Sequence, residues 1–130
     1  MSKGIIQIKS THDFDTTYSK LRTLLDNNSM IGIVAELDHQ KNAARVDLEL
    51  GKTRMILFGN PRLGTPLMKT NILISLDLPQ KFIVREQDGQ VYIAFNDPAY
   101  LKDRHQIEGK DEVFEKISGA LHKLANAAAS

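Results

Sequence analysis

Hydrophobic and polar positions alternate along the chain in two different rhythms. Phe14, Tyr18 and Leu21 recur every three or four positions, as on one face of a helix, whereas Val91 and Ile93 alternate with polar neighbours, as in a half-buried strand. Short runs in which apolar and polar residues alternate, or in which all residues are apolar, predict five strands, most of them separated by helical segments.

The predicted strands cover residues 4–9, 30–37, 53–58, 81–86 and 90–96, and the predicted helices cover residues 14–28, 38–48, 61–71, 98–105 and 111–126. Asp88-Gly89, between the last two strands, is typical of a tight hairpin turn. Residues 127–130 are expected to fray, because chain ends that nothing ties down are poorly ordered.

This order predicts one α+β domain spanning residues 1–130, with a mixed five-stranded sheet covered by helices. Strand-helix-strand units favour parallel neighbours, and the hairpin adds an antiparallel pair. Residues 55–58 have no polar face, so their strand is expected in the interior of the sheet. Residues 30–37 are nearly all apolar before Glu36, so we expect their strand to be covered on both faces.

Composition narrows the classes of partner. The net charge is +1 and the cations are scattered, which argues against nucleic acid or a membrane surface as a partner. The absence of cysteine excludes disulfides, thiol nucleophiles and zinc sites that need Cys. No apolar run approaches the ~20 residues that span a bilayer, and no signal-peptide pattern follows Met1, so we expect a cytoplasmic protein.

Two predicted strands run directly into helices that begin with a capping residue and proline. Asn60 precedes Pro61, and Asp97 precedes Pro98. Helix capping alone explains both pairs. Ligands of open α/β sheets, however, bind outside the carboxyl ends of strands. If the two strands are parallel, one concavity is expected to bring together the candidate binding residues Asn60, Thr65, Asp97 and Tyr100, with His39 or His105 at its rim.

The same region resembles a phosphate-binding loop only in part. Gly59 and Gly64 have the required spacing, but Thr65 stands where that loop needs lysine, and Pro66 lacks a backbone N–H. This argues against a nucleotide triphosphatase. No two histidines have the i, i+4 spacing of a helical metal clamp, so we predict no metal and no cofactor.

Longer motifs carry a resemblance to a known family. They are Phe58-Gly59-Asn60-Pro61, Gly64-Thr65-Pro66-Leu67-Met68, Asp77-Leu78-Pro79 and Asn96-Asp97-Pro98-Ala99-Tyr100-Leu101. From Ile6 to His105 the chain resembles the domain of unknown function 302 family. Phe95 is a departure, since similar sequences commonly carry Tyr there. The resemblance implies a small bacterial or archaeal α+β domain that forms a homodimer, and it offers no catalytic residues to carry over.

An apolar excess in one segment also favours a homodimer. Six apolar residues crowd positions 68–78: Met68, Ile72, Leu73, Ile74, Leu76 and Leu78. A short helix and loop can hide only part of them, and the remainder predicts a patch larger than monomers usually expose.

Three functions stay open at this point. The first is a non-enzymatic module, homodimeric, that binds a small molecule or another protein near Asn60, Thr65 and Asp97. It requires a mostly apolar pocket whose polar groups are satisfied. The second is an enzyme that uses Asp97, Tyr100, His39 or His105 in acid–base roles, which requires at least two titratable groups converging in a cleft. The third is a purely structural dimer without a pocket.

Overall fold

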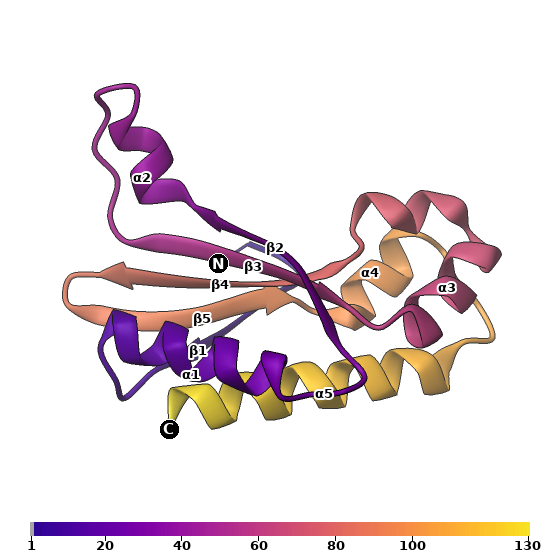
Figure 1. Ribbon diagram of the computed structural model, residues 1–130. Helices are drawn as coiled ribbons and strands as arrows, with labels where there is room; N and C mark the ends of the chain where they lie inside the picture. Colours follow the sequence, from indigo (N-terminus) through magenta and orange to yellow (C-terminus); the bar gives the residue numbers. More distant parts are fainter. Residues whose placement is uncertain (1) are drawn as a thin grey trace.

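The computed structural model describes residues 2–130 and shows a single α+β domain (Figure 1). Its strands are β1 (Ile5–Lys9), β2 (Gly32–Asp38), β3 (Thr53–Gly59), β4 (Gln80–Gln87) and β5 (Gln90–Asn96). Its helices are α1 (Phe14–Asp26), α2 (His39–Ala44), α3 (Pro61–Thr70), α4 (Pro98–Arg104) and α5 (Asp111–Ala129), with a 3₁₀ helix η1 (Ile72–Leu76) where a loop was predicted. The predicted class and the five strands are confirmed.

The sheet has the order β1-β5-β4-β3-β2, and every neighbouring pair is antiparallel. The predicted interior place of β3 is confirmed. The expected parallel neighbours are not found, because α1 carries the chain from β1 at one edge to β2 at the other instead of to an adjacent strand. Since β3 and β5 are each antiparallel to β4, these two strands still run in the same direction.

Helices α1 and α5 lie side by side against one face of the sheet and enclose the core (Figure 1). Alternate residues of the central strands point into this core, as period-two strands require. The rings of Phe58 and Phe82 stack across neighbouring strands with centroids 5.0 Å apart, and Phe82 and Phe95 meet edge to face with centroids 5.4 Å apart. These aromatic residues bury large apolar areas and anchor the sheet to the helices.

The end of α5 is ordered, although residues 127–130 were expected to fray. Ala128 and Ala129 are buried, and the backbone N–H of Thr11 donates to the carbonyl of Ala129 over 2.8 Å. The hydroxyl of Thr11 donates to the same oxygen over 3.0 Å. The last turn is therefore held by the segment that follows β1, which satisfies a carbonyl that a helix end otherwise leaves unpaired.

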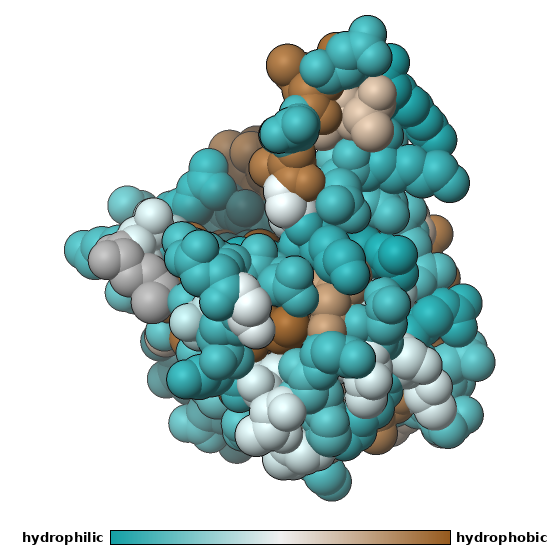
Figure 2. All heavy atoms as spheres, turned by 90° about the vertical axis from the view of Figure 1, so that its left-hand side faces the viewer, coloured by the Kyte–Doolittle hydropathy of each residue, from teal (hydrophilic) through white to brown (hydrophobic). Residues whose placement is uncertain are grey.

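Strand β2 departs most from its prediction. It was expected to be covered on both faces, but it lies at the sheet edge and most of its residues are exposed, with Val34 at 66%. Helix α2 and the loop after it, residues 39–51, form a protruding segment that we call the arm. Helix α2 contributes no buried residue. Figure 2 views the molecule from this end, where apolar and polar residues mix on the protrusion.

Candidate functional site

A cavity of about 770 Å³ opens where β3 ends and β2 begins, between α3 and α5. Most of its lining is apolar and comes from separate elements: Ile33, Phe58, Leu63, Met68, Leu78 and Leu121. Phe58 and Leu121 are also members of the buried core. The cavity is therefore a recess in the hydrophobic core at one end of the sheet.

The start of α3 forms one wall of this cavity. Asn60 caps the helix, since its Oδ1 accepts from the backbone N–H of Arg62 over 3.1 Å. Its carbonyl accepts from the N–H groups of Leu63 and Gly64, both at 3.0 Å. Pro61 stands at the first helical position, where its missing N–H costs nothing. The helix thus uses both oxygens of Asn60, while its amide nitrogen Nδ2 makes no hydrogen bond within residues 2–130.

The charges on the cavity wall have one sign. Arg62 on α3 and Lys116 on α5 line it, and its lining contains no Asp or Glu. Within the described part of the chain, neither cation takes part in an ion pair. Both side chains are exposed, so their charges are available to a molecule at the cavity mouth.

The structure brings some of the predicted site residues together and separates others. Because β3 and β5 run in the same direction, Asn60 and Asp97 lie at the same end of the sheet, as predicted. Asn60 and Thr65 line the cavity, but Asp97 and Tyr100 do not. The expected single concavity around all four residues is therefore wrong.

Asp97 and Tyr100 lie at the junction between α4 and the N-terminal segment and contact both. Asp97 caps α4, its Oδ1 accepting from the N–H of Ala99 over 3.0 Å, and its own N–H donates to the carbonyl of Gly4 over 2.8 Å. The ring of Tyr100 lies against Gly4, where a β-carbon would come within 2.2 Å of the ring. Only glycine fits there, and its φ of +78° also favours glycine.

His39 lies at the opposite end of the sheet from the cavity. It is the first residue of α2, directly after β2, whose last residue Asp38 pairs with Arg54 near the beginning of β3. Since β2 and β3 are antiparallel, the end of one lies beside the start of the other. The prediction that His39 could stand at the rim near Asn60 is wrong for this reason.

His105 belongs to a separate polar cluster. Its Nε2 lies 2.6 Å from Oδ2 of Asp77, and Arg104 donates to the same oxygen over 2.7 Å. Asn71 donates to the backbone carbonyl of His105 over 2.8 Å. This cluster ties α4 to η1 and to the segment before β4, and it is not part of the cavity lining. Within residues 2–130, no group of three or more His, Cys, Asp or Glu side chains is placed to hold a metal ion.

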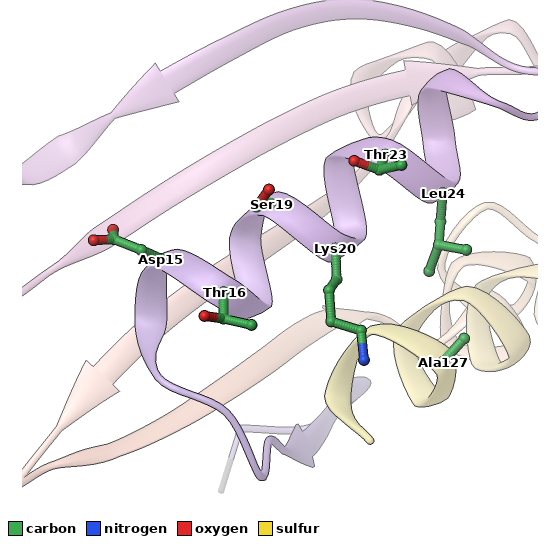
Figure 3. A pocket seen from close by; sticks show the side chains of 7 residues that line it. All are labelled: Asp15, Thr16, Ser19, Lys20, Thr23, Leu24 and Ala127. Atoms are coloured by element: carbon green, nitrogen blue, oxygen red, sulfur yellow. The ribbon is translucent and has the colours of Figure 1, made fainter.

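A second hollow, about 530 Å³, lies over α1 and the end of α5 (Figure 3). Lys20 and Leu24 reach from α1 towards α5, where Ala127 lies. Nζ of Lys20 donates to the carbonyl of Ser130 over 2.6 Å. None of the predicted site residues lines this hollow, and its cation is already engaged, so the cavity beside α3 is the stronger candidate.

Sequence reasoning missed the residues that close the cavity from β2 and α5. Ile117 and Leu121 lie at helical spacing on α5 and belong to the buried core, but nothing in the sequence marks them as part of a site. No sequence pattern indicated that Ile33 or Lys116 belongs to a site. Their position beside the cavity depends on where β2 and α5 pack, which no local pattern predicts.

The family model for the domain of unknown function DUF302 matches residues 6–124. The chain belongs to this family. An uncharacterized conserved DUF302 protein from Bacillus stearothermophilus has the same fold, with a TM-score of 0.86 and 16% sequence identity over 98% of this chain and 99% of the other. The predicted family is confirmed.

The Brucella relatives that match this DUF302 chain are longer than it. It is 32% identical over 108 residues to the fluoride-specific ion channel FluC 1 of Brucella suis, a match that covers 82% of this chain and 42% of the relative. FluC 2 of Brucella melitensis is similar to the same degree, with 40% of its length covered. The chain therefore spans about two fifths of these relatives. Within residues 2–130, no helix combines the length and the apolar character needed to cross a membrane.

Proposed function

We propose that this DUF302 chain is a small-ligand-binding module whose site is the cavity between α3, α5 and the end of the sheet. The observation that carries the proposal is the cavity itself, about 770 Å³ and lined mainly by apolar side chains. Ligand pockets typically measure roughly 300–1,000 Å³ and combine apolar walls with a few polar groups. Asn60, Thr65 and Arg62 supply such polar groups along one wall.

The cavity favours binding over catalysis. Its lining contains no His, Asp or Glu, so it lacks the usual acid–base groups. Asp77 and His105, a titratable pair in direct contact, stand outside it.

A fluorescence titration tests this proposal. N-phenyl-1-naphthylamine is a neutral apolar probe that brightens when it leaves water, and we expect saturable binding to the native protein. Leu63→Trp fills the cavity from α3 and should weaken binding at least about tenfold, since an occluded pocket loses most of its apolar contact area. Lys69→Trp, on the same helix but outside the lining, is the matched control and should bind like the native protein. Absence of saturable binding to the native protein would remove the proposal.

A homodimer is the second part of the proposal. On η1, Ile72, Leu73 and Leu76 are 65%, 61% and 71% exposed, and on the arm Val46 and Leu48 are 65% and 64% exposed. The arm stands on the side of the sheet away from α1 and α5 (Figure 1). Apolar exposure of this kind exceeds what a monomer usually shows, and a second copy offers the same surfaces for mutual burial.

Analytical ultracentrifugation tests the homodimer. We expect a dimer at micromolar concentration that Leu73→Glu and Leu76→Glu together dissociate, because each places a charge in the apolar interface. Glu112→Lys changes the charge of an exposed residue on α5 and should leave the dimer intact. A native protein that sediments as a strict monomer would contradict this part.

The match to the Brucella proteins favours a further candidate role, that of a cytoplasmic module that acts beside a membrane channel. The chain corresponds to only part of proteins named fluoride-specific ion channels, and joining two modules in one chain raises their effective concentration for each other. Fluoride efflux from liposomes that contain the Brucella suis relative, whole or without its matched 108-residue segment, measures this. Equal efflux rates from the two proteins, with and without added apolar ligand, would exclude the role.

A further inference from the structure

We infer that the ligand of the cavity is an amphipathic monocarboxylic acid, with an aliphatic body in the apolar recess and its carboxylate at Arg62 and Lys116. The inference rests on the proposed binding function and adds the chemical class of the ligand. It depends on three properties of the lining: its charge, its hydrogen-bond donors and its apolar depth.

The charge of the lining selects an anion. Arg62 and Lys116 approach the cavity from two different helices, α3 and α5, and the lining holds no carboxylate to neutralise them. Neither cation makes an ion pair within residues 2–130. A bound carboxylate would supply the missing partner, and an arginine can bind it through two parallel hydrogen bonds.

Uncharged donors on the same wall add to this preference. Nδ2 of Asn60 and the hydroxyl of Thr65 have no hydrogen-bond partner within the described residues, and both residues line the cavity. Asn60 Oδ1, the acceptor of that side chain, is already used to cap α3. The wall therefore offers mainly donors, and an ionised carboxylate is a pure acceptor.

The interior of the cavity requires an apolar body. Phe58, Ile117 and Leu121 line the cavity and are only 3%, 7% and 2% exposed, and Ile33 and Met68 add further apolar lining. A polyphosphate would have to bury several charges against these side chains with only two cations to balance them. A single carboxylate at the mouth leaves the interior to methylene groups.

Calorimetric titration with hexanoate, octanoate, 1-octanol and octylammonium tests the inference. We expect each added methylene to tighten carboxylate binding about three- to fourfold, the equivalent of burying one CH₂ group. Octanoate should bind at least about tenfold more tightly than 1-octanol, since hydrogen bonds to a charged group are the stronger ones. Octylammonium, which the two cations repel, should not bind measurably.

Charge-removing variants locate the carboxylate. Arg62→Gln and Lys116→Gln should each weaken octanoate about tenfold and leave 1-octanol binding unchanged, because they remove the cation but not the recess. Lys69→Gln, an exposed cation on α3 outside the lining, is the control and should leave both affinities unchanged. All three residues are exposed, so the variants should fold, which a thermal melt verifies.

The outcomes separate the inference from the function on which it rests. If octanoate and 1-octanol bind equally, and Arg62→Gln and Lys116→Gln change neither, the carboxylate inference is overturned while the binding function stands. If the neutral naphthylamine probe, octanoate and 1-octanol all fail to bind, the binding function itself is overturned. Tight binding of octylammonium would also overturn the inference.

Discussion

The two ends of the sheet are built in opposite ways. At the cavity end, α3, η1 and α4 are joined to the body of the protein through buried side chains and polar contacts, among them Leu67, Ile74 and Leu101. At the arm end, α2 buries nothing, and every residue from 45 to 51 is exposed. Both regions nevertheless carry apolar residues among polar ones.

The difference shows that apolar residues stabilise a segment only where the fold supplies a surface to cover them. Leu67 and Leu48 are the same residue type, yet one is 1% and the other 64% exposed. The cavity end is therefore expected to carry much of the folding free energy, and the arm to be stable only locally or in contact with another molecule.

The largest expected effect comes from the aromatic cluster. Phe82→Ala should lower the free energy of unfolding by about 3–5 kcal/mol, because Phe82 is fully buried between two other rings. Val46→Ala on the arm should change it by no more than about 0.5 kcal/mol. Urea denaturation at a protein concentration low enough to avoid association measures both. Comparable losses in the two variants would abolish the distinction between the ends.

The polar cluster of the cavity end should have the next largest effect. Asp77→Asn weakens the contact to the buried His105 and the ion pair to Arg104, and we expect a loss of about 1–3 kcal/mol. Arg104→Gln removes only the exposed partner, so its loss should stay below about 1 kcal/mol. Thermal and urea unfolding compare the two, and an equal loss would show that His105 does not depend on Asp77.

Helix caps provide a smaller, matched comparison of the two ends. Asp97 caps α4 and Asp38 caps α2, each by accepting a bond from a backbone N–H. Asp97→Ala should cost about 1 kcal/mol of global stability. Asp38→Ala also removes a partly exposed ion pair to Arg54 on β3, so it should lower global stability by less than about 0.5 kcal/mol. Its main effect should be faster hydrogen exchange in α2, because α2 is not packed on the core. A global loss as large as that of Asp97→Ala would show that the arm is part of the cooperative unit.

The smallest effect concerns the contact between α1 and β2. The hydroxyl of Tyr18 donates to Glu36 over 2.6 Å, and burial, followed by this bond, raises the pKa of Tyr18 above the ordinary value of 10.0. The fold thus favours the neutral phenol, so this contribution to stability is complete below pH 10 and is lost as pH rises above it. Absorbance at about 295 nm should show a late-titrating tyrosine that Tyr18→Phe removes. Identical titration curves for the two proteins would contradict this.

Much of the architecture could be predicted from local patterns. The strand of residues 90–96 and the helix starts at Pro61, Pro98 and Asp111 agree with the structure, because alternation, caps and proline act over a few residues. The error about β2 has a physical cause: an apolar strand at an edge and an apolar strand in the interior have the same composition. The arm, likewise, was predicted as an ordinary helical segment.

Of the candidate site, the sequence by itself indicated Asn60 and Thr65, because a capping residue followed by proline marks the start of α3 locally. That Asn60 and Asp97 lie at the same end of the sheet follows from the pairing of β3 and β5 with β4. The sequence also determined the family, through motifs that run along the chain. Only the tertiary structure decided that Asp97 and Tyr100 serve a different junction, that His39 lies at the far end, and that Lys116 faces the cavity with Arg62. These relations depend on which strand pairs with which and on where α5 packs, and such long-range contacts leave no periodic trace in the sequence.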